Sequence, residues 1–355
     1  MKKNIKALTG IRGIAAVLVV FYHLLHHSVS MTFLQNGYLS VDLFFILSGF
    51  IMMYVHKSDF EEGVTVNKYV SFIGSRIIRV WPAYILWLSL NIILLFKHNN
   101  APSMIQTFAN FFMIQNWMLS KSIVGTGWSL SVEFFVYFFF PIICFIFSRG
   151  RKNILITLAI CLSSIIFISI CKIKFITGTQ NSFSGPMDLI SYDGTGALIR
   201  GLSEFSLGVS SFFVFRYMSS KDRISNITCF LSLVAIIVSM INKSYDILFI
   251  VSSFFLIPSL ASSSNLITKI IGSRVPFFLG KISYSLYLCH IPLAYSLYSF
   301  FSKHISSDYF SDSVTKLLLA CFTLSFCIAI AWASYLISEK RSFIKYLTFK
   351  PKNIA

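Results

Sequence analysis

Long apolar runs recur from one end of the chain to the other, and they constrain the fold more than any other feature. A helix needs about 20 mostly apolar residues to cross the hydrocarbon core of a bilayer, and these runs are of that length. They are continuous, whereas the strands of a transmembrane barrel alternate apolar and polar residues. Of the 355 residues, 56% are hydrophobic and 12% are charged. The sequence therefore predicts an all-α, polytopic transmembrane helix bundle.

About ten spans are predicted. The segment 104–119 is apolar but short, so it is expected to be interfacial or re-entrant. The first run follows several lysines, as in a signal peptide, but it is long and lacks a cleavage site, so it is interpreted as a retained helix. The predicted spans cover residues 10–28, 38–55, 77–96, 128–148, 153–173, 196–217, 224–242, 245–262, 277–302 and 314–338.

The positive charge is distributed unevenly between the predicted loops. With the N-terminus in the cytoplasm, 21 of the 30 Lys and Arg fall on the inner side and 7 on the outer side. Arg12 and Arg200 are the two that remain inside predicted helices. Because cytoplasmic loops are enriched in Lys and Arg, we predict that both termini are cytoplasmic. This orientation also explains the net charge of +17 without a nucleic-acid partner.

A single domain is expected. No internal repeat or low-complexity tract is visible, so residues 1–345 are predicted to form one membrane-embedded domain and residues 346–355 a short basic cytoplasmic tail. The seven cysteines lie in or beside apolar runs without metal-binding spacing, and no metal site is predicted.

Arg12 and His23 are the first candidates for a functional role. Eleven residues of helix turn through about 1100°, so the two side chains lie on one face, roughly 16 Å apart along the axis. Ionisable groups inside a membrane are costly and usually functional. His23 is a candidate general base, with a hydrogen-bonded core histidine as an equally weighted alternative.

Three further charged residues each have more than one interpretation. Arg76 and Arg79 share a helix face and suit phosphate groups, or they anchor a membrane entry. Glu133 either orients His23, holds a donor hydroxyl, or pairs with Arg200.

The remaining candidates belong to a polar cluster expected in the outer half of the bundle, with Arg12, Arg76 and Arg79 below it. Asp42 is either a substrate ligand or an N-cap at the start of the second span. A second set of candidates comprises Trp128 and Ser129 beside Glu133, and Tyr284, Tyr287 and His290, which share one helix face.

Five motifs in order resemble the acyltransferase-three family of bacterial membrane proteins, which acylate surface glycans. The resemblance covers residues 7 to about 340. The motifs are "GIRGIAAVLVVFYH", "SVDLFFILSGF", "SRIIRVWPAY", "GWSLSVEFFVYFFFP" and "LGKISYSLYLCH".

The resemblance implies an O-acetyltransferase in the bacterial inner membrane, with acetyl-CoA as donor and a glycan hydroxyl as acceptor. Arg76 and Arg79 would hold the phosphates of CoA. His23 would deprotonate the acceptor or accept the acetyl group first, and Arg12 would line the thioester path or stabilise developing charge. The acceptor would be a repeat unit of O-antigen lipopolysaccharide, capsule or exopolysaccharide.

The sequence departs from the family at two points. Thr9 stands where many members have Asp, and "SEKRSF" lacks the usual proline, so Glu339 is given no site role. No C-terminal SGNH-type domain is expected, which favours direct transfer to a lipid-linked or polymerised repeat unit.

Two alternatives stay open at this point. One is a transporter or flippase for an anionic or lipid-linked sugar, although no inverted repeat or pair of broken helices is evident. The other is an acyltransferase that uses succinyl or another acyl group. The oligomeric state is not predicted.

The predicted orientation can be measured with single cysteines introduced into a cysteine-free variant. Residues 60–68 and 149–152 should be protected from a membrane-impermeant thiol reagent in intact cells, and residues 175–195 should react. Labelling at Arg151 from outside would contradict the orientation.

Overall fold

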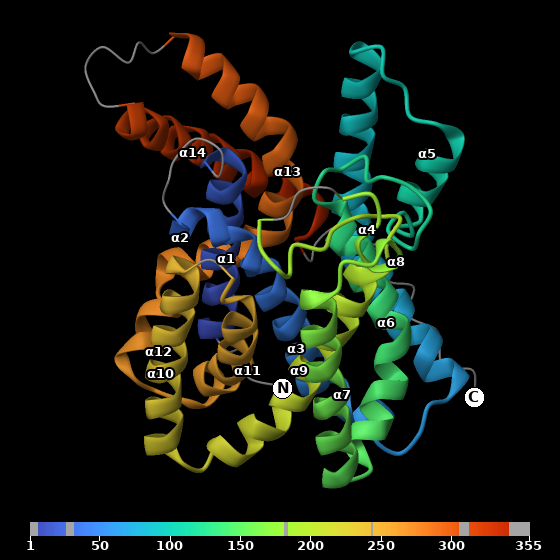
Figure 1. The fold of residues 1–355 in the computed structure, drawn as a ribbon, viewed down its shortest axis with the longest axis vertical. Coiled ribbons are helices and arrows are strands. Elements are labelled where there is room, and N and C mark those ends of the chain that lie inside the picture. The colour runs from blue at the N-terminus through green and yellow to red at the C-terminus, as the bar shows by residue number, and fades with distance from the viewer. Residues whose placement is uncertain (1–5, 26–31, 181–183, 243, 305–311, 341–355) are drawn as a thin grey trace.

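The computed structural model describes residues 6–25, 32–180, 184–242, 244–304 and 312–340. Every regular element in these ranges is a helix (Figure 1). The predicted tail, 346–355, lies outside the described residues. The helices are α1 Lys6–Leu25, α2 Thr32–Gln35, the 3₁₀ turn η1 Asn36–Leu39, α3 Ser40–Phe60, α4 Val66–Lys97, α5 Met104–Phe111, α6 Gly127–Ser148, α7 Arg151–Ile170, α8 Lys174–Thr177, α9 Gly196–Met218, α10 Asp222–Ile241, α11 Asp246–Ser262, α12 Leu266–Ile271, α13 Arg274–His304 and α14 Asp312–Ser338.

The predicted all-α bundle is confirmed, and each of the ten predicted spans overlaps one of the long helices. Eight helices of the described chain are long and apolar enough to cross a membrane. The apolar α11, with 17 residues, is shorter, and α13 also falls outside that set. The chain is therefore a multi-pass membrane protein.

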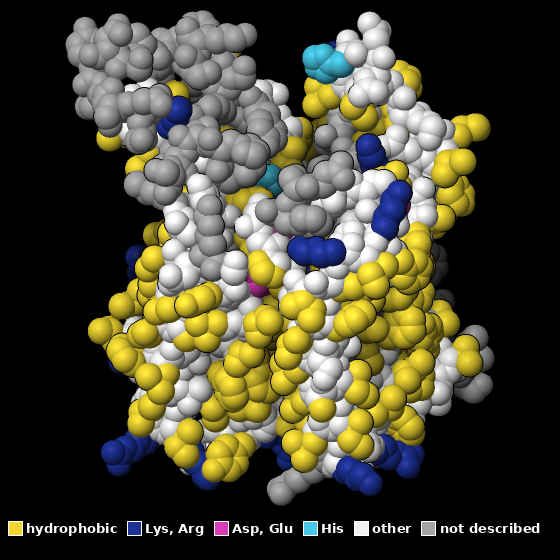
Figure 2. Space-filling model, in the orientation of Figure 1, with side chains coloured by type: hydrophobic (Ala, Val, Ile, Leu, Met, Phe, Trp, Pro, Cys, Tyr) yellow, Lys and Arg dark blue, Asp and Glu magenta, His cyan; other side chains and the backbone are white. Residues whose placement is uncertain are grey.

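Basic side chains gather at one end of the bundle. The connections from α6 to α7 and from α9 to α10 lie at the lower end of Figure 1. Figure 2 shows Lys and Arg along this same lower rim, below a broad apolar belt. This is the end predicted to be cytoplasmic. The orientation of the chain in the membrane stays a prediction.

The segment predicted to be interfacial forms the short helix α5 and a series of turns. Ser103 caps α5 by accepting the N–H of Gln106 at 3.2 Å. Met104, Ile105 and Phe108 are exposed on its surface. An eight-residue helix with an exposed apolar face is too short to span a bilayer.

Helix α1 packs most extensively against α13. Glycines allow this close approach, because a Cβ added at Gly280 would collide with the carbonyl oxygen of Thr9. A Cβ at Gly13 would lie 2.5 Å from the backbone N of Gly280. Small residues bring membrane helices into backbone contact, and here they place the polar residues of α1 beside those of α13.

Helices α3 and α9 cross in the same way. A Cβ at Gly49 would collide with the carbonyl of Phe205, and one at Gly208 with the carbonyl of Ile46. Each glycine therefore faces the backbone of the opposite helix, and together they allow α9 to pack closely against α3.

Substitution of Gly208 by Ala should destabilise the protein, because the added methyl group meets rigid backbone rather than a flexible side chain. Overpacking of this kind costs about 1–3 kcal/mol. Thermal denaturation in detergent measures the effect. Gly74→Ala on α4 is the matched control, since nothing lies within 4 Å of its added Cβ, and an equal loss in both variants would contradict the close crossing.

Candidate active site

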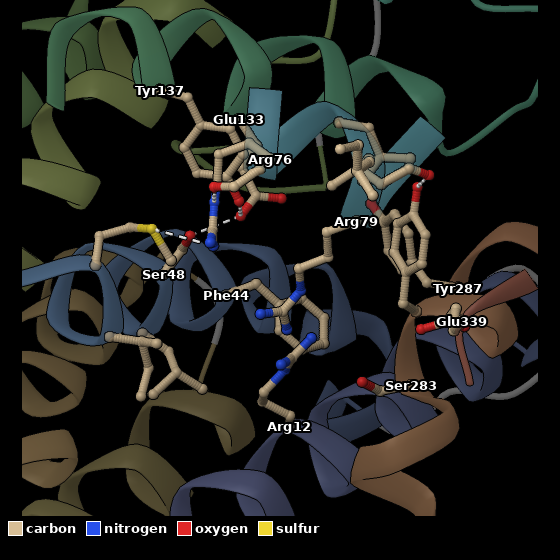
Figure 3. Close-up of a pocket in the computed structure, with 18 of the residues that line it drawn as sticks. Arg12, Phe44, Ser48, Arg76, Arg79, Glu133, Tyr137, Ser283, Tyr287 and Glu339 are labelled. Carbon is tan, nitrogen blue, oxygen red and sulfur yellow. Dashed lines mark hydrogen bonds between the residues drawn. The ribbon is translucent and has the colours of Figure 1, made fainter. Parts of the chain in front are cut away.

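A cavity of about 1070 Å³ opens between α1, α3, α4, α6, α13 and the end of α14. Apolar side chains of α3 and α4 form much of its wall, including Phe44, Phe45 and Val80. Polar side chains of α1, α3, α4, α6 and α13 project into it (Figure 3). Seven of the eleven predicted site residues line this cavity: Arg12, Arg76, Arg79, Ser129, Glu133, Tyr284 and Tyr287.

Four basic side chains line the cavity. Arg12 comes from α1 and Arg79 from α4, and Figure 3 shows the two pointing toward each other into the same space. Arg76 lies one turn from Arg79, and Lys281 contributes from α13. The spacing of Arg76 and Arg79 predicted a shared face, and both do line the cavity. Lys281 was not predicted as a site residue, because the sequence indicated only that it belongs to the basic residues on the predicted inner side.

Arg76 is held in place by groups of α3 and α4. Its Nη1 lies 3.6 Å from Met52 Sδ, its Nη2 lies 3.4 Å from His56 Nε2, and its guanidinium lies 5.6 Å from the centre of the Phe72 ring. These contacts orient one guanidinium at the cavity wall, with no carboxylate among them.

Glu133 is bound by two hydroxyl groups. Its Oε1 accepts hydrogen bonds from Ser48 on α3 and from Tyr137, one turn along α6, both at 2.6 Å. Figure 3 shows this group beside Arg76. The alternative in which Glu133 pairs with Arg200 is wrong, because Arg200 is bound elsewhere.

Asp42 and Trp128 lie behind the cavity wall rather than in it. Asp42 is completely buried and accepts hydrogen bonds from Arg200 Nε at 2.8 Å and Nη2 at 2.7 Å. The Trp128 ring lies 5.6 Å from the same guanidinium. The N-cap alternative for Asp42 is also wrong, since Leu39 holds the N-cap position of α3. These residues join α3, α6 and α9 behind the site.

Glu204 adds a second carboxyl group to this buried cluster. Its carboxylate lies 3.6 Å from Arg200 Nε and is completely buried. Two carboxyl groups therefore share one guanidinium in a low-dielectric interior, where an uncompensated charge is costly.

Hydroxyl groups tie α13 to the opposite wall of the cavity. Tyr284 donates to the carbonyl of Val80 at 2.8 Å, and the hydroxyls of Tyr287 and Ser129 are 2.7 Å apart. Glu339, one residue past α14, lines the cavity and accepts from Ser285 Oγ at 2.5 Å. From sequence Glu339 was given no site role, because the proline that usually follows it is missing. The sequence feature that could have identified Glu339 is its acidic side chain at the predicted cytoplasmic end of the last span.

His23 and His290 lie beyond the cavity lining, next to each other. His23 Nδ1 is 3.2 Å from His290 Nε2, and the ring centres are 4.9 Å apart. Tyr287, which lines the cavity, precedes His290 by one helical turn. Both histidines were predicted as site residues, but their contact with each other was not predicted, because 267 residues separate them.

A polar loop lies against α1 beside His23. The hydroxyls of Tyr22 and Ser184 are 2.7 Å apart, and the Ser184 N–H donates to Asp188 Oδ2 at 2.8 Å. Burial raises the pKa of this Asp188 side chain above its usual range. In the described part of the chain, no three His, Cys, Asp or Glu side chains are grouped to hold a metal ion.

Comparison with known proteins identifies the family. The sequence profile of an acyltransferase domain matches residues 5–337, so the chain belongs to this acyltransferase family. It is 26% identical over 331 residues to the O-acetyltransferase OatA of Staphylococcus aureus strain NCTC 8325, a match that covers 84% of this chain and 52% of that protein.

A second relative comes from Staphylococcus aureus strain COL and bears a provisional O-acetyltransferase name. It is 26% identical over 385 residues, covering 99% of this chain and 60% of that protein. The chain thus spans little more than half the length of these curated relatives.

Replacement of Arg200 by Ala should strongly destabilise the bundle, because Asp42 would be left as a buried, unpaired charge. Breaking a buried ion pair by removing one partner costs about 3–5 kcal/mol. Membrane yield and thermal denaturation in detergent measure the loss. Arg216→Ala, at an exposed position on the same helix, is the control. If both variants retained wild-type stability, the ion pair would have no structural role.

Proposed function

We propose that the protein is an O-acetyltransferase that moves an acetyl group from cytoplasmic acetyl-CoA to a hydroxyl of a cell-surface glycan. The observation that carries the proposal is the cavity, which combines four basic side chains with a wall that includes Tyr287, whose carbonyl oxygen lies 2.9 Å from Nδ1 of His290 in the histidine pair. Membership of the acyltransferase family supports the reaction class.

The basic side chains suit the phosphates of the donor. Guanidinium groups bind phosphate through two parallel hydrogen bonds, and lysine adds a compact charge. Arg76, Arg79 and Lys281 would hold the phosphates of CoA, with its pantetheine arm extended along the apolar wall toward Tyr287. Arg12, pointing into the same space from α1, would line the path of the thioester.

The histidine pair suits the acceptor step. His23 would take the proton of the glycan hydroxyl, whose oxygen then attacks the thioester carbonyl. If the acetyl group is first transferred to His23, the same ring nitrogen reacts. The polar loop that contains Ser184 and Asp188 lies beside this position and offers hydrogen-bonding groups to a sugar.

In this proposal the chain lies in the bacterial inner membrane with its N-terminus inside. The acceptor would be a lipid-linked or polymerised repeat unit of O-antigen, capsule or exopolysaccharide. The basic end of the bundle in Figure 2 would then face the cytoplasmic pool of acetyl-CoA.

The reaction is tested by adding acetyl-CoA and cell-surface glycan to the purified protein in liposomes. Release of free CoA together with a mass increase of one acetyl group on the glycan would support the proposal. Transport of glycan without CoA release would overturn it. A mass increase of one succinyl group with succinyl-CoA, and none with acetyl-CoA, would show that the acyl group is succinyl.

Replacing both Arg76 and Arg79 by Lys should weaken acetyl-CoA binding while preserving the charge. Lysine lacks the planar pair of donors, and loss of one charged hydrogen bond costs about 1.5–3 kcal/mol. The expected change is about 10–100-fold in Kd, measured by titration in detergent at fixed ionic strength.

The matched control is the double replacement of Arg149 and Arg216 by Lys, both at exposed positions outside the cavity. Equal affinity in wild type and in the Arg76/Arg79 variant would show that these arginines only anchor the membrane entry.

A further inference from the structure

His290 is completely buried, and its ring contacts determine where its proton lies. Nδ1 is 2.9 Å from the carbonyl oxygen of Tyr287 and 3.2 Å from that of Leu286. A carbonyl oxygen only accepts, so Nδ1 must carry the hydrogen. In a neutral ring, Nε2 then carries the lone pair and acts as an acceptor.

The contacts of His23 complete the assignment. Its Nδ1 is 2.9 Å from the carbonyl oxygen of Val19 and 3.2 Å from His290 Nε2. Both neighbours are acceptors, so His23 Nδ1 carries a hydrogen shared between them. In the neutral ring, the lone pair of His23 is therefore on Nε2.

The opposite assignment is physically inconsistent. If His290 donated from Nε2 instead, His23 Nδ1 would have to present its lone pair to His290. That same lone pair would then face the carbonyl oxygen of Val19 at 2.9 Å, and two acceptors would oppose each other without a hydrogen between them.

We propose that His290 is a positioning residue for His23, in the place that a carboxylate takes in a Ser-His-Asp triad. It holds the His23 ring with Nε2 as the basic nitrogen. It also accepts from Nδ1–H when His23 becomes an imidazolium. The inference rests on the proposed function, in which His23 is the general base, and it assigns no proton transfer to His290.

The proton balance follows from these positions. The acceptor hydroxyl gives its proton to His23 Nε2 as its oxygen bonds to the acetyl carbon, and the carbon–sulfur bond breaks. His23 Nε2 then returns the proton to the leaving thiolate, which yields the acetyl ester and free CoA thiol. His290 keeps its own proton on Nδ1 throughout.

Two substitutions separate positioning from packing. His290→Phe fills the space but removes the acceptor, so kcat should fall by about 10–100-fold, part of the roughly 10²–10⁴-fold that a general base contributes. The Kd for acetyl-CoA should stay unchanged, because His290 lies outside the donor cavity. His290→Gln retains an oxygen acceptor at the Nε2 position and should recover most of the rate.

Cys289→Ala is the control for lost packing, since Cys289 is equally buried on α13 and its Sγ lies 3.6 and 3.8 Å from the carbonyl oxygens of Leu286 and Cys327. Equal activity of the Phe and Gln variants, or weakened acetyl-CoA binding in both, would overturn the positioning role.

NMR of protein labelled at the histidine ring nitrogens tests the assignment without relying on activity. The His23 signal is identified by its loss in His23→Gln, and it should show a protonated Nδ1 and an unprotonated Nε2. A His23 ring protonated at Nε2 alone would overturn the proposal. Absence of transferase activity in the wild type, with the expected NMR signals, would instead refute the proposed function.

Discussion

The close packing of α1 against α13 is the constraint on which the candidate site depends. Glycines at the contact, Gly13 and Gly280, remove the side chains that would hold the two helices apart. Arg12 consequently reaches the cavity, which Lys281 of α13 also lines, and His23 reaches His290 eleven residues further along α1. A helix separation larger by one methyl group would weaken the contact between His23 and His290, because hydrogen bonds lose strength steeply with distance and angle.

The bundle contains buried charge in two different settings. Arg200 is enclosed, bound by Asp42 and close to Glu204, and it joins α3 to α9 at the glycine crossing. Arg12 and Arg79 instead point into open cavity space. A paired interior charge stabilises one arrangement of helices, whereas a charge facing a cavity is available to a ligand. The location of cavity and cluster thus separates the arginine that is bound within the protein from the arginines that face the cavity.

Much of the fold was predictable because it depends on local sequence. Each long helix follows from an apolar run. The spacing of Arg76 and Arg79 predicted a shared face of α4, and in the structure both residues line the cavity. The cavity position of Glu339 was not predicted from local sequence, since it depends on how α14 packs against α13. Nor was that of Lys281, whose position in the helix resembles that of any basic residue near a cytoplasmic end.

The sequence by itself determined the all-α membrane architecture, the family resemblance and seven polar or charged residues of the cavity, because hydrophobic length and helical period are properties of short segments. Tertiary structure alone decided the partners of the polar groups. Arg200 binds Asp42, 158 residues away, and not Glu133, while His23 meets His290 across 267 residues. In an apolar interior each polar group must be satisfied by whatever neighbour the packing supplies, and that neighbour depends on helix crossings that no single segment encodes.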